Sequence, residues 1–163
     1  SIHWLKKSKE IDQDLNYNYL LFHKLGLALF NINLIEDSII EFEKAINLNP
    51  GNADLYFCLG LSKFKISNFN PEILVEAFNC MTKVIELKLL DEEAYKFRSM
   101  IRSHFNDMKG AKEDLLHAIS INPNNPENLK QLKMIEHNIR LNNNQDISSS
   151  FQEIDRWLRG NYI

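Results

Sequence analysis

Apolar side chains recur at helical spacing along much of this chain. Phe22, Leu25 and Leu29 fall on one face of a helix, because residues three and four apart lie on the same side. Towards the C-terminal end the same spacing returns in two further segments, residues 129–139 and residues 151–158. The pattern predicts a chain built of amphipathic helices.

Three stretches of the sequence also resemble one another. Their opening aromatic residues are spaced by 34 and then 39 residues, whereas their closing residues are spaced by 39 and then 34. The middle stretch therefore contains five extra residues, most simply residues 70–74, which would lengthen its second helix by about one turn. Self-similarity at this period indicates stacked helix pairs. The three stretches are residues 22–50, 56–89 and 95–123.

Glycine and proline refine this prediction. Gly26 and Gly60 lie inside helical segments, where glycine costs about 1 kcal/mol relative to alanine. We expect the compensation to be a close approach of the paired helix, with Ala45 and Ala118 serving the same purpose from the second helices. Pro residues that follow Asn mark helix ends or starts. These prolines are Pro50, Pro71, Pro123 and, after Asn125, Pro126.

The repeated pattern resembles the tetratricopeptide repeat, whose signature is a large aromatic residue, Leu-Gly, a small residue, an aromatic residue, Ala and a closing Pro. Repeat one carries Phe22, Leu25, Gly26, Phe42, Ala45 and Pro50. Repeat two carries Tyr56, Leu59, Gly60, Phe64 and Ala77, and repeat three carries Tyr95, Ala111, Leu115, Ala118 and Pro123. Two departures are the missing closing Pro of repeat two and Arg98-Ser99 in place of Leu-Gly. The resemblance implies an all-α fold, a right-handed α-α superhelix of such repeats, also called an α-solenoid.

The expected organisation has three full repeats between helical ends. The first segment is either a truncated half-repeat or an ordinary N-terminal capping helix, and the sequence leaves both open. Since the first residue is Ser rather than Met, the chain is open to being a piece of a longer protein. The segments are residues 1–15 at the N-terminus, 19–52, 53–91 and 92–125 for the repeats, 126–141 for a capping helix, 142–150 for a linker and 151–160 for a C-terminal amphipathic helix.

Composition argues against several classes of function. The net charge is −3 and no repeat carries a basic stripe, so we expect no nucleic-acid partner. Cys58 and Cys80 have no His at ligand spacing, which predicts inert buried thiols, no metal and no cofactor. With no secretory signal or transmembrane run, we expect no membrane insertion and a reducing, cytoplasmic location. No catalytic or phosphate-binding motif is present, which predicts that the chain is not an enzyme.

In the family that the sequence resembles, five positions of each first helix line a concave groove. Repeat one supplies Leu20, His23, Leu27, Phe30 and Asn31, repeat two supplies Asp54, Phe57, Leu61, Phe64 and Lys65, and repeat three supplies Glu93, Lys96, Met100, Ser103 and His104. From these the predicted peptide-binding residues are Leu20, His23, Leu27, Phe30, Phe57, Leu61, Phe64, Lys96 and Met100. The groove is largely apolar, and exposed apolar surface of this extent marks a binding site.

One subgroup of the family binds the acidic C-terminal tails of chaperones through a clamp of Lys, Asn and Arg side chains. The corresponding positions here hold His23, Leu27, Cys58, Glu93 and Phe97. The clamp is absent, and a Glu at one of its positions repels a carboxylate. We therefore expect no binding of chaperone tails in this manner.

Three hypotheses remain. The first is a scaffold or adaptor that binds an apolar or amphipathic peptide of a protein partner in the groove. The second is a structural assembly component, with homo-oligomers left open. The third is a regulatory module of a larger enzyme or chaperone, whose own C-terminal helix at residues 151–158 occupies the groove. The sequence leaves an external partner and self-filling equally open.

Overall fold

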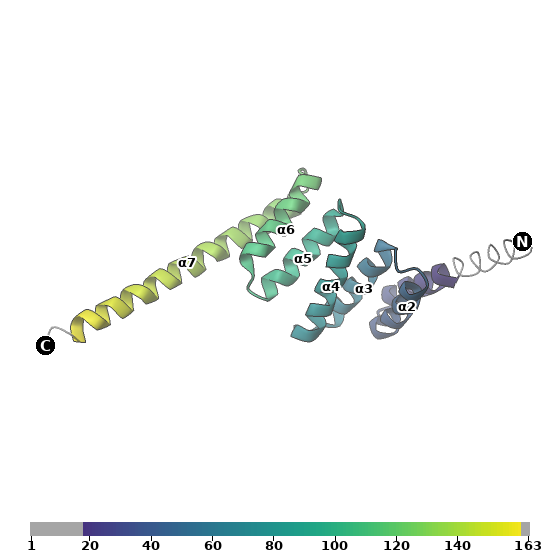
Figure 1. Ribbon diagram of the computed structural model, residues 1–163, viewed down its shortest axis with the longest axis horizontal. Coiled ribbons are helices and arrows are strands. Elements are labelled where there is room, and N and C mark those ends of the chain that lie inside the picture. Colours follow the sequence, from purple (N-terminus) through teal and green to yellow (C-terminus); the bar gives the residue numbers. More distant parts are fainter. Residues whose placement is uncertain (1–17, 161–163) are drawn as a thin grey trace, which may run out of the picture.

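The computed structural model describes the backbone of residues 18–160 and the side chains of residues 18–143, and every regular element in this part is an α-helix. The helices form pairs that stack side by side (Figure 1). The predicted all-α architecture of stacked helix pairs is therefore confirmed, while the predictions for residues 1–15 lie outside the described residues. The helices are residues 18–31, α2 (Ile35–Leu48), α3 (Ala53–Ile66), α4 (Pro71–Leu87), α5 (Glu92–His104), α6 (Met108–Ile121) and α7 (Pro126–Gly160).

Short polar residues define where the helices begin and turn. The Asn70 side chain accepts a hydrogen bond from the Glu72 backbone N–H at the start of α4, with Pro71 in the first turn, as the sequence predicts. Within each repeat, the turn between the two helices contains an Asn in the left-handed backbone region, which Asn tolerates better than most residues. These are Asn33 (φ 65°), Asn68 (φ 44°) and Asn106 (φ 59°).

Gly26 and Gly60 lie where the paired helix approaches closely, as predicted. A Cβ atom on Gly26 would lie 2.6 Å from the Phe42 ring, and one on Gly60 would lie 2.8 Å from the end of the Met81 side chain. Both distances are below van der Waals contact, so only glycine fits without displacing a core side chain. Ala45 and Ala118 on the second helices are fully buried.

The five extra residues of the middle repeat fall around the start of its second helix. α4 has 17 residues, whereas α2 and α6 have 14 each. The connection from α3 to α4, residues 67–70, is one residue longer than the corresponding connections at residues 32–34 and 105–107, and it includes Phe69 with a φ of 65°. The middle repeat therefore has a longer second helix and a larger preceding turn than its neighbours.

The apolar core has two parts of unequal size. The larger part lies between α4, α5, α6 and the start of α7, and includes the fully buried Met81, Ile101 and Leu115. A smaller cluster, centred on Phe42 and Leu59, joins the first repeat to the second. Polar contacts reinforce this junction: the Ser38 and Ser62 hydroxyls lie 3.2 Å apart, and Lys63 pairs with Glu43 of α2 and Glu76 of α4.

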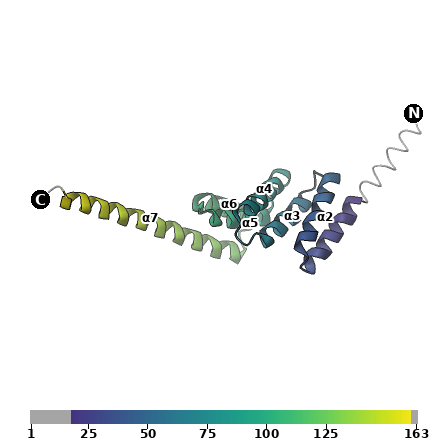
Figure 2. The ribbon, with the colours of Figure 1, turned by 90° about the horizontal axis from the view of Figure 1, so that it is seen from below.

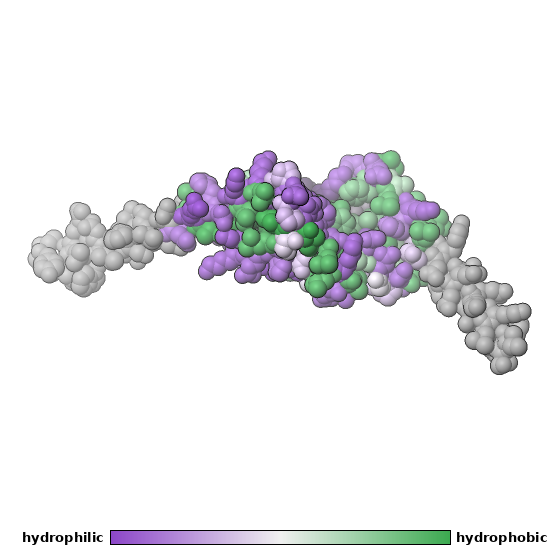
Figure 3. All heavy atoms as spheres, turned by 90° about the horizontal axis from the view of Figure 1, so that it is seen from above, coloured by the Kyte–Doolittle hydropathy of each residue, from purple (hydrophilic) through white to green (hydrophobic). Residues whose placement is uncertain are grey.

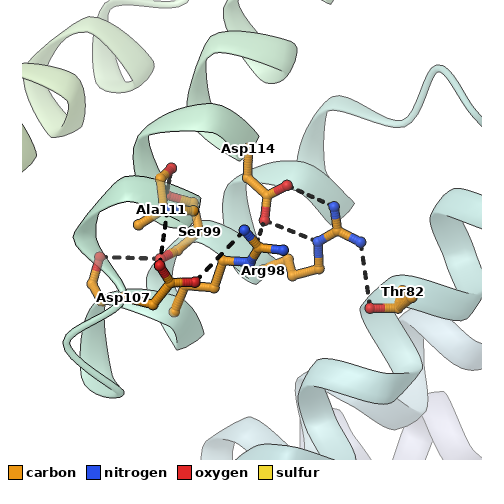
Figure 4. Close-up of polar contacts among 9 residues, drawn as sticks. Thr82, Arg98, Ser99, Asp107, Ala111 and Asp114 are labelled. Carbon is orange, nitrogen blue, oxygen red and sulfur yellow. Dashed lines mark hydrogen bonds and ion pairs between the residues drawn. The ribbon is translucent and has the colours of Figure 1, made fainter.

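At repeat three the expected Leu-Gly pair is replaced by a buried polar network (Figure 4). The Arg98 guanidinium donates two hydrogen bonds to the Asp114 carboxylate, which is 2% exposed, and Ser99 donates to the Ala111 carbonyl oxygen at 2.7 Å. Arg102 also contacts Asp114, at 3.2 Å. Charged hydrogen bonds thus connect α5 to α6 where other repeats use close apolar packing.

The C-terminal end differs from the prediction. α7 runs without a break from Pro126 to Gly160, so residues 142–150 are helical rather than a linker, and residues 151–160 are not a separate helix. Asn and Ser disfavour a helix by well under 1 kcal/mol each, and neither Gly nor Pro occurs between residues 127 and 159 to end it. The C-terminal half of α7 extends away from the stack (Figures 1 and 2).

Candidate functional site

The first helices of the three repeats contribute the candidate surface, and the helix at residues 18–31 supplies its most exposed apolar part. Leu20 and Leu27 are each 38% exposed, whereas His23 and Phe30 are half-buried. Exposed apolar side chains are not confined to this helix. The face seen in Figure 3 carries apolar patches separated by polar side chains.

Aromatic rings from α3 and α5 form a continuous row, which we call the aromatic row: Phe57, Phe97, Phe64 and His104. The Phe97 ring lies edge-on to Phe57, with ring centroids 5.9 Å apart, and edge-on to Phe64 at 6.3 Å. Phe64 in turn lies 6.1 Å from the His104 ring. Edge-to-face pairs at these distances are favourable beyond their buried area, so the row holds α3 against α5.

Exposure divides the predicted site residues into two groups, the exposed Leu20 and Leu27 and the half-buried remainder. Phe57, Leu61 and Phe64 are half-buried and pack against the larger core, so each contributes only part of its surface to a ligand. Leu20 and Leu27 lie on the helix at residues 18–31 and present more free surface. Met100 and Lys96 are half-buried on α5.

Two lysines lie against aromatic rings of this surface. The Lys65 ammonium lies 4.8 Å from the centroid of Phe30, which joins the ends of α3 and the helix at residues 18–31. The Lys96 ammonium lies 5.8 Å from the Phe97 centroid and 2.6 Å from a carboxylate oxygen of Glu93. Lysine above an aromatic face is attracted by the ring, which orients the cation along the surface.

Nearer the starts of the helix at residues 18–31 and of α3, His23 and Cys58 face each other. The Cys58 Sγ lies 3.8 Å from the His23 Nε2. Burial lowers the pKa of His23, and this effect outweighs the opposing attraction of Asp54. Burial, followed by the charge of Asp54, raises the pKa of Cys58 to about 11. Both side chains are therefore uncharged at neutral pH, and the thiol is a poor nucleophile.

Sequence reasoning missed two residues of this region. In the sequence Phe97 stands only as a replacement at a clamp position, whereas in the structure its ring is central to the aromatic row. Phe69, in the enlarged turn before α4, is 74% exposed and lies 5.1 Å from the His104 ring. Its signal in the sequence was an aromatic residue between two Asn residues just before the predicted helix start.

Within the described side chains, no group of three or more His, Cys, Asp or Glu residues is placed to hold a metal ion. Among the helices of residues 18–160, none combines the length and apolar character needed to cross a membrane.

Comparison with known proteins defines the class of this chain. Residues 20–52 and 93–125 match the family described as tetratricopeptide repeat, that is, the first and third predicted repeats. The middle repeat, which carries the insertion, has the same helix-pair structure. The chain therefore contains tetratricopeptide repeats in these two segments, as the sequence motifs predict. No curated protein has a significantly similar sequence.

Several solved structures share the fold of this chain. The first TPR of Spaghetti (RPAP3), bound to the HSP90 peptide SRMEEVD, superposes with a TM-score of 0.70 at 19% identity, covering 76% of this chain and 94% of that one. The second TPR domain of human RPAP3, in complex with the HSP70 peptide SGPTIEEVD, gives 0.67 at 20% identity, covering 75% and 98%. MamA gives 0.70 at 19% identity, covering 93% and 86%. At these identities the similarity is one of fold.

Proposed function

We propose that this chain is a protein-interaction module that binds an apolar or amphipathic peptide segment of a partner protein. The peptide would lie along the first helices of the repeats, on Leu20, His23, Leu27, Phe30, Phe57, Leu61, Phe64, Lys96 and Met100. The observation that carries the proposal is the 38% exposure of Leu20 and Leu27 on the first helix of repeat one, while the first helices of the next two repeats carry the aromatic row. Apolar side chains with free surface next to aromatic anchors favour a peptide ligand.

The structural neighbours support a peptide ligand in general. Two of them are TPR domains bound to short chaperone peptides. Those peptides end in acidic residues, and the proposed surface has no matching set of cations. Cys58 carries a neutral thiol at neutral pH, and Glu93 adds negative charge. We therefore infer an apolar or amphipathic ligand rather than an acidic C-terminal tail.

The test is a pull-down from cells of the source, read by mass spectrometry, with the Leu20→Asp, Leu27→Asp double variant. Both side chains are exposed, so the substitutions add charge to the surface without entering the core, unlike a change at half-buried Leu61. A matched control is the Ile40→Asp, Leu116→Asp variant, which alters similarly exposed side chains, 50% and 45%, on the second helices α2 and α6. Circular dichroism must show that all three proteins are folded.

A partner lost only with the Leu20 and Leu27 substitutions supports the proposal. A partner lost only with the Ile40 and Leu116 control moves the binding surface to the second helices. Retention of every partner by both variants overturns binding on the first helices.

An assembly function is a second candidate, because the turn between α4 and α5 exposes two adjacent leucines. Leu89 is 69% exposed and Leu90 is 73% exposed, where repeats one and three have Pro-Gly or Pro-Asn. An apolar pair at a turn favours contact with another protein surface. Light scattering of the Leu89→Ser, Leu90→Ser variant tests this, since the second candidate predicts that a wild-type oligomer dissociates.

A further inference from the structure

The enlarged turn before α4 holds an aromatic side chain in an unfavourable conformation. Phe69 has a φ of 65°, in the left-handed region that bulky residues avoid, and its side chain is 74% exposed. This backbone conformation costs about 1–2 kcal/mol for a residue with a Cβ. Burial of the Phe69 ring in the core does not offset this cost, because most of the surface of the ring faces solvent.

The Phe69 ring instead forms one wall of a small cavity. The cavity has a volume of about 150 Å³ and is lined by Phe64, Lys65, Ser67, Asn68, Phe69 and His104. The His104 ring stands between the other two rings, with centroids 5.1 Å from Phe69 and 6.1 Å from Phe64. We call this cavity the turn pocket.

The floor and rim of the turn pocket have different chemistry. Ser67 is 5% exposed, and its hydroxyl donates to the Phe64 carbonyl oxygen at 2.9 Å, so that donor is already used. At the rim, Lys65 carries a positive charge, and no Asp or Glu lines the pocket. Within residues 18–143, Lys65 forms no ion pair, whereas Lys63, two residues earlier, pairs with Glu43 and Glu76. The pocket therefore has aromatic walls and a positively charged rim.

The turn pocket is continuous with the proposed peptide surface. Phe64 and His104 belong both to the pocket and to the aromatic row. Lys65 also lies over Phe30 of the helix at residues 18–31. A peptide lying along the first helices would thus reach the pocket at the ends of α3 and α5.

We propose that the turn pocket anchors a bulky apolar side chain of the partner peptide that has a carboxylate next to it. The rings would enclose the apolar side chain, and Lys65 would pair with the carboxylate. This inference rests on the proposed function and specifies it. Five of the six lining residues belong to the middle repeat and the sixth, His104, belongs to repeat three, so the anchor lies where these two repeats meet.

The experiment is an NMR titration of the ¹⁵N-labelled chain with three capped tripeptides, N-acetyl-Glu-Phe-Glu-amide, N-acetyl-Lys-Phe-Lys-amide and N-acetyl-Glu-Ala-Glu-amide. We expect the first to shift the backbone resonances of Lys65, Phe69 and His104 at the lowest concentration. The second lacks the carboxylates and the third lacks the ring. Both should bind about tenfold more weakly or not at all.

Two substitutions assign the effect to the pocket. Phe69→Ala removes an exposed wall and should weaken binding of Glu-Phe-Glu about tenfold. Lys65→Gln should weaken it about threefold and make the affinity less dependent on salt. Phe105→Ala is the matched control, because it removes an exposed ring from the corresponding turn of repeat three, outside the pocket lining. It should leave the affinity unchanged.

Two results would contradict the proposal that the turn pocket binds the peptide. One is a set of shifts at Leu20 and Leu27 that Phe69→Ala leaves unaltered, which places the peptide elsewhere on the first helices and leaves the proposed function standing. The other is no shift at the pocket with any tripeptide up to millimolar concentration. The pull-down with the Leu20 and Leu27 variant tests the proposed function independently of either result.

Discussion

Arg98 and Asp114 form a two-point ion pair between α5 and α6, with Nη2 to Oδ1 at 2.6 Å and Nε to Oδ2 at 2.9 Å. Asp114 is 2% exposed, and it also lies 3.2 Å from the Nε of Arg102. Both guanidinium groups lie close to the Phe78 ring, at 5.9 Å and 5.7 Å. The position at which the family has Leu-Gly thus carries a charged network with a single buried anion and two cations.

We expect Asp114→Ala to destabilise the fold by about 3–5 kcal/mol, because it leaves two arginines without their shared anion in a buried site. The change is measurable as a lower midpoint of urea unfolding, followed by circular dichroism. Glu136→Ala is the control, since it breaks the pair between Lys112 and Glu136, whose side chains are 37% and 34% exposed, and should have a much smaller effect. Equal losses from both variants would contradict a special role for the buried network.

The glycine contacts lead to a second prediction. Gly26→Ala places a Cβ 2.6 Å from the Phe42 ring, so either the ring or the helix must move. We expect a destabilisation of about 1–3 kcal/mol from overpacking, despite the higher helix propensity of alanine. Thermal unfolding of Gly26→Ala and of the Gly26→Ala, Phe42→Leu double variant checks this, because the smaller side chain should restore part of the loss.

Gly51→Ala is the matched control for this prediction. A Cβ there meets nothing within 4 Å, and the backbone does not require glycine. We expect it to be neutral or slightly stabilising, since alanine restricts the unfolded chain. A stabilising Gly26→Ala would show that the helix pair separates without cost.

The repeat architecture was predictable because it depends on residues that recur. A glycine within a helical segment, such as Gly26 or Gly60, predicts close approach of a neighbouring helix. Asn followed by Pro, as at residues 70–71, predicts the start of a helix. Both predictions are confirmed by the contacts of these residues. The groove positions Leu20 and Leu27 came from family resemblance alone, and their role in binding remains a prediction.

The parts that escaped prediction depend on tertiary contacts or on weak preferences. The Asn and Ser content of residues 142–150 predicts a linker, but such propensities are small and the helix continues through these residues. The position of Phe69 depends on a left-handed backbone conformation, which cannot be predicted from an aromatic residue in the sequence. Arg98 and Asp114 lie on two different helices, so no local sequence pattern predicts that they pair.

The two cysteines give a prediction about pH. Burial is the largest cause that raises the pKa of both Cys58 and Cys80 to about 11, compared with an ordinary value of 9.0. The folded state therefore holds these protons more tightly than the unfolded state. The contribution to stability is complete below pH 9 and is lost as the pH rises through about 11.

We expect both thiols to react slowly with iodoacetamide at pH 8 in the folded protein and quickly in urea, as measured by mass spectrometry. Cys58→Ser, Cys80→Ser should remove part of the alkaline decrease in unfolding free energy between pH 9 and pH 11. Rapid labelling of Cys58 without urea would show instead that His23, 3.8 Å away, activates it as a thiolate.

The last prediction concerns the acidic peptide SRMEEVD, which is bound to the first TPR of Spaghetti in its structure. Binding of its carboxylates requires cations, and the surface here offers a neutral His23, a protonated Cys58 and the carboxylate of Glu93 at the corresponding positions. We expect no saturable change in fluorescence anisotropy when a labelled SRMEEVD peptide is titrated with this chain. The first TPR of Spaghetti serves as the positive control under the same conditions, and a peptide with an amidated C-terminus tests whether any residual signal depends on the terminal carboxylate. Saturable binding that amidation abolishes would mean that other cations, such as Lys65 or Lys96, replace the clamp. That result would favour an acidic ligand over the apolar or amphipathic ligand proposed above.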